Sequence, residues 1–212
     1  CLSQVYNIEM GLPPDLDDSD LLVKFFEAIT QLKKDKKILA YHDRSDGGLF
    51  ASLCEMSFAG NIGMDIHLNS NTKDETLRLL FTEELGGLLQ VENNDLDEVM
   101  AVLNKYSLTK NSLKIAEVIK RKTIRLRADY GYEKTYDLNE LRKMWSELSY
   151  KMQAHRDNPI TAKEGFESIF VEDPGLCPSI SFEPVNIQNE SLRDTNRPKV
   201  AILRDQGVNS HI

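Results

Sequence analysis

Residues 41–49 read YHDRSDGGL, a polar turn between a short strand and a helix. The apolar run at 38–42 precedes the turn and predicts the strand. Small and apolar residues at 49–59 predict a helix that ends at Gly60, a residue type common at helix C-termini. Two carboxylates, a hydroxyl and two glycines are therefore crowded where the N–H groups of a helix start point outward. This turn is the strongest local signal in the sequence.

The turn has two interpretations. In the first it is a binding site, because glycine lets the backbone approach a phosphate, aspartate supplies hard oxygen for Mg²⁺, and serine can bond a phosphate or a metal. In the second it is a plain turn, in which Ser45 or Asp46 caps the helix and the glycines permit positive φ. Spacing alone leaves both open. The turn is not a Walker A loop, since no lysine follows the glycines.

Hydrophobic periodicity predicts further helices and strands on both sides of the turn. Helical spacing of apolar residues predicts helices at 19–34, 75–81 and 96–103, and short or alternating apolar runs predict strands at 62–68, 88–91, 113–119 and 123–128. Strands and helices are mixed and the last two strands are close in sequence. We therefore expect an α+β domain over residues 1–136, with a mixed sheet and helices packed on one face.

A longer helix is expected at 137–156. Asp137 can cap it, and Glu140 three residues on completes a capping-box pattern. The helix carries an apolar stripe formed by Leu138, Leu141, Trp145, Leu148 and Met152. We interpret the stripe as packing surface and the lone tryptophan as a core anchor.

The amino-acid composition and periodicity of the sequence change after this helix. Five of the seven prolines lie beyond residue 158, with little periodicity among them, so residues 157–197 are predicted to be an extended connector. We expect it to be mobile or held only by docking to neighbours. The apolar run at 200–203 resembles a buried parallel strand and predicts the start of another α/β domain at 198–212.

Composition excludes several classes of function. The 212 residues are 41% hydrophobic and 28% charged, as in soluble globular proteins. A net charge of −8 argues against nucleic-acid partners and anionic lipid surfaces. The apolar runs are too short for a membrane helix. The three cysteines show no CxxC or Cys/His ligand spacing, which favours a reduced, cytoplasmic protein.

Other chemically capable side chains have structural explanations. Glu83 and Glu84 precede two glycines. They form either an acid/base or metal pair or, as is more common for adjacent acids, one solvated carboxylate and one that is capping or paired. His42 is interpreted as a hydrogen-bonded structural histidine. His67 has no partner that the sequence reveals. Cys54 falls in an apolar helix and is expected to be core.

Five stretches together resemble one family. They are YHDRSDGGL at 41–49, EMSFAG at 55–60, FTEELG at 81–86, MQAHRDNP at 152–159 and RPKVAILRDQGVNSH at 197–211. In this order they are similar to the large, single-chain phosphoribosylformylglycinamidine synthases. The match spans the end of the second aminoimidazole-ribonucleotide-synthetase-like half and the start of the glutamine amidotransferase domain.

The resemblance implies an ATP-dependent ligase of purine biosynthesis that converts formylglycinamide ribonucleotide to the amidine with ammonia from glutamine. It implies that Asp43 ligates Mg²⁺ and that Ser45 contacts a phosphate of ATP, or of ADP held as a structural nucleotide. It also implies that the chain packs against other domains of its own polypeptide. No nucleic acid or membrane partner is implied.

The departures from the family pattern also matter. The Gly-x-Cys spacing at 175–177 falls in the predicted connector and not on a strand-to-helix elbow, and no His/Glu pair follows it. The sequence therefore offers no catalytic residue for glutamine hydrolysis. We expect this segment to be inactive alone. Gly87 stands where relatives often have alanine. Two alternatives stay open: a stand-alone nucleotide-binding kinase of the same superfamily, and a non-enzymatic interaction module.

Overall fold

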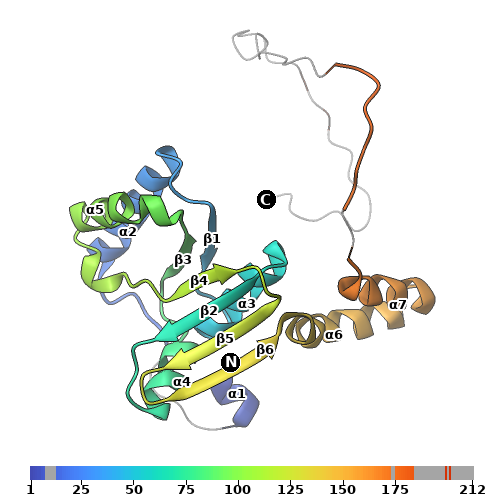
Figure 1. The fold of residues 1–212 in the computed structure, drawn as a ribbon, viewed down its shortest axis with the longest axis horizontal. Coiled ribbons are helices and arrows are strands. Elements are labelled where there is room, and N and C mark those ends of the chain that lie inside the picture. Colours follow the sequence, from blue (N-terminus) through green and yellow to red (C-terminus); the bar gives the residue numbers. More distant parts are fainter. Residues whose placement is uncertain (8–12, 173–174, 184–198, 200, 202–212) are drawn as a thin grey trace. The chain divides into compact units, whose positions relative to one another are not determined.

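The computed structural model describes residues 1–7, 13–172, 175–183, 199 and 201 (Figure 1). The chain divides into two compact units, Cys1–Val171 and Glu172–Ile212. In the first unit the strands are β1 Ala40–Asp43, β2 Gly63–Leu68, β3 Gly87–Gln90, β4 Ala116–Ile119, β5 Thr123–Ala128 and β6 Tyr132–Asp137. The helices are α1 Leu2–Tyr6, α2 Ser19–Lys34, α3 Gly48–Gly60, α4 Lys73–Phe81, α5 Leu96–Lys105, α6 Leu138–Arg156 and α7 Pro159–Glu167, with short 3₁₀ turns between some of them.

The main sheet has four strands in the order β4-β2-β5-β6. The pair β2–β5 is parallel, with Ile66 opposite Leu126, and the other two pairs are antiparallel. Strands β2 and β5 confirm the predictions at 62–68 and 123–128, because alternating residues give each strand one buried face. The expected mixed sheet is therefore present.

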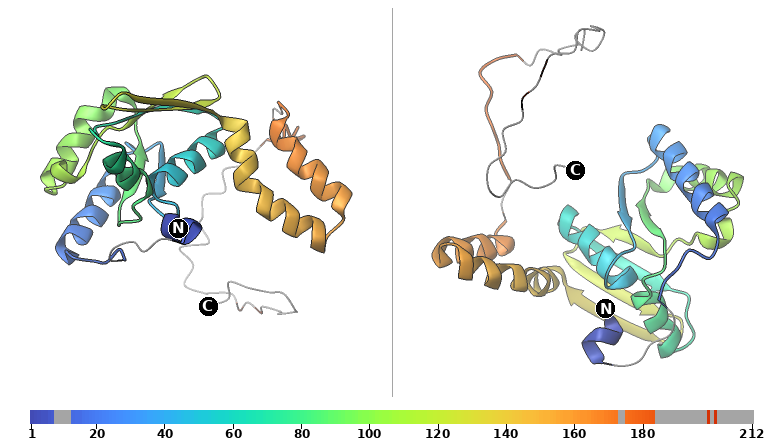
Figure 2. Two further views of the ribbon diagram at one scale, coloured as in Figure 1. Left: turned by 90° about the horizontal axis from the view of Figure 1, so that it is seen from below. Right: turned by 180° about the vertical axis from the view of Figure 1, so that it is seen from behind.

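Helices cover one face of this sheet (Figure 2). Leu53 and Phe58 of α3 and Leu80 of α4 pack against Ile66 and Leu126, forming the larger of two buried clusters. The opposite face is polar. This one-sided packing is the α+β arrangement that the sequence predicts.

A second, smaller layer holds the strand that leads to the turn. Strand β1 pairs only with β3, antiparallel, as a separate two-stranded sheet. Its neighbours α2 and α5 share a buried cluster that includes Leu32 and Leu103. Asp18 caps α2 by accepting a hydrogen bond from the Leu21 N–H at 3.0 Å.

Two expectations about α6 have different outcomes. The cap is confirmed, since the Asp137 carboxylate accepts a hydrogen bond from the Glu140 N–H at 3.0 Å. The core role of Trp145 is wrong, because its side chain is 59% exposed. Only Leu138 of the stripe is buried, and α6 projects beyond the sheet from there.

Among the described residues, no helix combines the length and apolar character needed to cross a membrane.

The extended connector predicted at 157–197 is wrong for its first part. Residues 159–167 form α7, because Asn158 accepts hydrogen bonds from Ile160 N–H at 2.9 Å and Thr161 N–H at 3.4 Å, and Pro159 takes the first helical position. Phe166 then stacks on Tyr150 of α6 at 4.5 Å. Residues 175–183 contain no helix or strand. The strand predicted at 200–203 and the domain start at 198–212 lie outside the described residues, apart from 199 and 201.

Candidate functional site

The turn between β1 and α3 is built on two glycines with positive φ. Gly47 has φ +84° and Gly48 has φ +73°, values that side-chain-bearing residues rarely adopt. A Cβ atom on Gly48 would lie 2.8 Å from the Leu80 carbonyl oxygen, so α4 passes directly against the turn. No side chain on the turn caps α3. The interpretation in which Ser45 or Asp46 caps this helix is therefore wrong.

Glu83 supplies the missing acceptor from a distant segment. Its Oε1 accepts a hydrogen bond from the Gly47 N–H at 2.8 Å, and this bond is the main reason why the pKa of Glu83 lies below its ordinary value. Glu84 is exposed, and its backbone carbonyl accepts a hydrogen bond from Arg44 Nε. Of the interpretations open from sequence, the structure favours one capping and one solvated carboxylate.

Because the pKa of Glu83 is lowered on folding, Glu83→Gln tests this contact through pH. The carboxylate contributes stability above its ordinary pKa, about 4.3 in an unfolded chain, and that contribution is lost as the pH falls through the lower folded value. We expect Glu83→Gln to cost about 1 kcal/mol at pH 7. The difference should begin to shrink as the pH falls below about 4.3 and should vanish only once the pH is below the lower folded pKa. Thermal unfolding of both proteins across this range measures it, and a pH-independent difference would contradict it.

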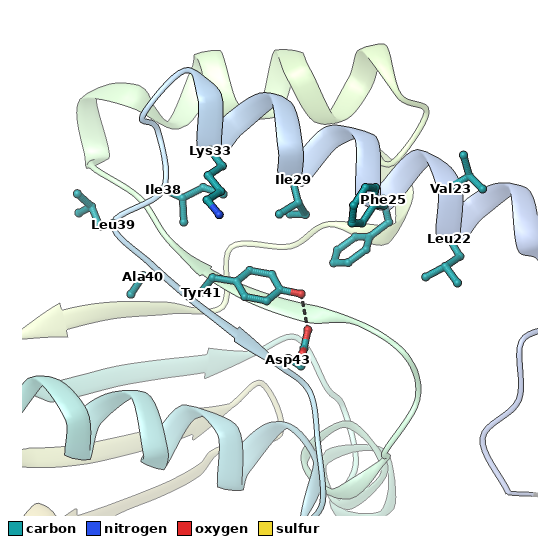
Figure 3. A pocket seen from close by; sticks show the side chains of 11 residues that line it. Leu22, Val23, Phe25, Ile29, Lys33, Ile38, Leu39, Ala40, Tyr41 and Asp43 are labelled. Carbon is teal, nitrogen blue, oxygen red and sulfur yellow. Dashed lines mark hydrogen bonds between the residues drawn. The ribbon is translucent and has the colours of Figure 1, made fainter. Parts of the chain in front are cut away.

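Asp43 ends β1 and carries a hydrogen bond from its own strand. The Tyr41 hydroxyl donates to Asp43 Oδ1. Burial, and then this bond, raises the pKa of Tyr41 to about 12. A cavity of about 870 Å³ opens beside the two residues (Figure 3). It is lined mainly by apolar side chains, among them Phe25 and Ile29 of α2 and Ile38 just before β1. Asp43 and Lys33 are the charged residues that line this otherwise largely apolar cavity.

His42 is hydrogen-bonded, as predicted, but its partners come from both sides of the turn. Its Nε2 lies 3.1 Å from Glu55 Oε2, and its Nδ1 lies 2.5 Å from the Asp43 carbonyl oxygen. The Ser45 N–H donates to Ser52 Oγ at 3.3 Å, which ties the middle of the turn to α3. Sequence reasoning does not identify Glu55 as a partner of His42, because the two lie 13 positions apart with no local pattern that links them.

Two other sequence assignments are settled by the structure. Cys54 is 6% exposed, and burial raises the pKa of its thiol to about 12, so it is a core residue. His67 does have a partner, since its Nε2 lies 2.8 Å from Asp129 Oδ1. That pair lies on the sheet and not at the turn.

Asp43 and Ser45 are the residues that the sequence analysis expects to bind a metal and a phosphate. Both are exposed, two residues apart at the end of β1. Within the described part of the chain, no group of three or more His, Cys, Asp or Glu side chains could hold a metal. A single carboxylate still fits Mg²⁺, which keeps several waters and is commonly bound through one or two carboxylates plus phosphate oxygens.

Comparison with known proteins gives a family and a relative. Residues 2–129 match the model described as AIR synthase related protein, C-terminal domain. The chain is 41% identical to the phosphoribosylformylglycinamidine synthase of Schizosaccharomyces pombe, over all of this chain and 16% of that protein. It therefore spans about a sixth of the length of this relative.

Solved structures show weaker likenesses. PurLQS from Thermotoga maritima matches with a TM-score of 0.49 and 16% identity over 64% of this chain and 23% of that chain. Thermotoga maritima PurL complexed with ATP matches at 0.47 and 18% identity, over 56% and 21%. Escherichia coli HypE, a hydrogenase maturation protein, matches at 0.42 and 27% identity, over 53% and 38%. Because each TM-score is below 0.5, we infer nothing further from these three.

Proposed function

Since the chain belongs to the AIR synthase related protein family, C-terminal domain, we propose that it is part of a phosphoribosylformylglycinamidine synthase. The observation that carries this proposal is the 41% identity to a protein of that name over the whole of this chain. A match confined to the turn would support only the broader family. The five quoted stretches extend beyond residue 129, where the family model ends.

The proposed reaction is an ATP-dependent ligation in de novo purine biosynthesis. ATP phosphorylates the amide oxygen of formylglycinamide ribonucleotide, and ammonia released from glutamine then displaces the phosphate to give the amidine. Among the residues described here we assign none to these bond-making steps. The proposed location is the cytoplasm.

The proposed task of this segment is to hold a nucleotide. Asp43 supplies an anionic oxygen for Mg²⁺, and the Ser45 hydroxyl donates to a phosphate oxygen of ATP or ADP. Two features of the structure support these roles: both side chains are exposed at the turn, and neither caps α3. The Gly47 N–H is already bound to Glu83, so the nucleotide contacts assigned here are those of the two side chains.

Activity of the full-length protein tests the proposed reaction. Incubated with formylglycinamide ribonucleotide, ATP and glutamine, the full-length protein should form the amidine, with glutamate and ADP as co-products in equal amounts. The 212-residue segment alone should form neither glutamate nor amidine above background, since its sequence has no glutaminase elbow. Amidine formation by the segment alone would contradict this assignment, as would an inactive full-length protein that is folded and binds ATP.

A further inference from the structure

Glu55 lies at the centre of a polar chain that joins α6 to the turn. Its Oε2 is 3.1 Å from His42 Nε2, and its Oε1 accepts a hydrogen bond from Trp145 Nε1 at 3.0 Å. The two partners come from β1 and α6, which are far apart in sequence. The side chains of Glu55 and His42 are only 27% and 29% exposed, so this contact is largely shielded from water. One carboxylate thus connects three elements.

This polar chain of side chains ends at the backbone of Asp43, the proposed metal ligand. His42 Nδ1 lies 2.5 Å from the Asp43 carbonyl oxygen. The Ser52 hydroxyl shares its one proton between this oxygen, at 3.3 Å, and the Gly48 carbonyl oxygen, at 3.1 Å. Helix α3 therefore holds the Asp43 main chain twice, directly through Ser52 and indirectly through Glu55 and His42. Tyr41 holds the Asp43 side chain from the other side. The position of the carboxylate depends on all three contacts.

Glu55 is not needed to anchor its own helix. Leu53, Cys54 and Phe58 make the buried contacts of α3 with the sheet, whereas Glu55 lies at the rim of the core. At the far end of the polar chain the Trp145 ring packs on Phe58, with ring centroids 5.7 Å apart. Removing the charge of Glu55 should therefore leave the packing of α3 intact and release the His42 ring.

We propose that Glu55 is a positioning residue for the nucleotide site at Asp43 and Ser45, acting through His42 and held in place by Trp145. This inference rests on the proposed function, because it concerns the same site. A ring released from Glu55 samples other rotamers, and the Asp43 backbone then loses one of its two links to α3. In that state the Asp43 carboxylate is no longer held in one position before binding. Binding of Mg²⁺ and nucleotide must then order it, and the entropy lost in doing so weakens the affinity.

The experiment titrates MgADP into the full-length protein after nucleotide and metal have been removed. Glu55→Gln keeps the size of the side chain and an oxygen for Trp145, but replaces the carboxylate that faces His42. We expect about tenfold weaker MgADP binding, the order of one lost hydrogen bond to a charged group, with unchanged stoichiometry. Trp145→Phe removes only the N–H donor and keeps an aromatic ring on Phe58, so we expect a smaller loss of about threefold.

A matched control removes another histidine–carboxylate pair. Asp129→Asn disrupts the contact with His67, which lies on the sheet away from the turn, and should leave MgADP affinity unchanged. The same titrations give the Mg²⁺ concentration at half-saturation, which Glu55→Gln should raise. A merely structural loss would instead reduce the amount of competent protein, seen as lower stoichiometry, while the affinity of the remaining sites stays that of the wild type.

The outcomes separate this inference from the proposed function. If Asp43→Asn abolishes MgADP binding and Glu55→Gln binds like the wild type, the positioning role is overturned and the site stands. Lower stoichiometry at unchanged affinity in Glu55→Gln also overturns it. If Asp43→Asn binds MgADP like the wild type, the proposed site is overturned, and the positioning role with it.

Discussion

We expect the full-length Asp43→Asn variant to be folded after purification but to retain no bound nucleotide. The amide has the size of the carboxylate and its oxygen can still accept the Tyr41 hydroxyl bond, so the end of β1 should keep its shape. It lacks the negative charge that a hard dication requires. Nucleotide released by acid from equal amounts of wild type and variant, measured by chromatography, gives the result directly.

Stability should fall with the nucleotide if that nucleotide is structural. A ligand present at 100 times its dissociation constant stabilises the folded state by about 2.7 kcal/mol, and Asp43→Asn should forfeit a contribution of that order. Ser45→Ala should do less, because one neutral hydrogen bond is worth roughly 0.5–1.5 kcal/mol. Thermal unfolding with and without added MgADP separates this loss from damage to the fold.

Asp46→Asn is the matched control for this prediction. It removes the same charge from the same exposed turn but does not alter the proposed ligand. We expect it to retain most of its nucleotide. Equal retention in wild type and Asp43→Asn would contradict the metal assignment, and equal loss in both variants would show that only the total charge of the turn matters.

Gly48→Ala should be the most destabilising single change at the turn. The new Cβ would require a left-handed backbone conformation and would lie 2.8 Å from backbone atoms of Leu80 and Phe81, which cannot move as a flexible side chain can. Strain and overpacking together should cost roughly 2–5 kcal/mol. The transition temperature of the full-length protein and its nucleotide content should both fall.

Gly131 provides the control for Gly48. It also has positive φ, +88°, but a Cβ atom there would meet nothing within 4 Å. Gly131→Ala should therefore cost only the conformational term, about 1 kcal/mol, and should leave the nucleotide in place. If the two alanine variants unfold at the same temperature, the close approach of α4 to the turn is not a significant constraint.

The parts of the fold that were predictable are those whose sequence pattern matches their burial. Strands β2 and β5 alternate because each has one face on the core, and the α6 cap is a local pattern. Strand β6 is not predicted, because only Tyr132 and Tyr136 are half-buried in an otherwise exposed edge strand. Helix α7 is not predicted, because proline is common in connectors, whereas Pro159 occupies the first helical position.

The site was only partly predictable for a different reason. The turn at 43–48 is local, so residue types and spacing point to it. The contacts that complete it are long-range: Gly47 to Glu83, and Trp145 to Glu55 across 90 residues of sequence. The periodicity of the apolar stripe on α6 predicts that Trp145 is a core residue. In the structure its indole N–H instead donates a hydrogen bond to the Glu55 carboxylate at the edge of the core. No local pattern encodes such pairings.

The central claim is that Asp43 binds a divalent metal that bridges to a nucleotide phosphate near Ser45. Mn²⁺ accepts the same oxygen ligands as Mg²⁺ and scatters anomalously, so diffraction from crystals of the full-length protein grown with Mn²⁺ and ADP locates the metal directly. We predict an anomalous peak at bonding distance from the Asp43 carboxylate, with a phosphate oxygen hydrogen-bonded to the Ser45 hydroxyl. Nucleotide and metal bound elsewhere, with Asp43 contacting only Tyr41, would contradict the claim.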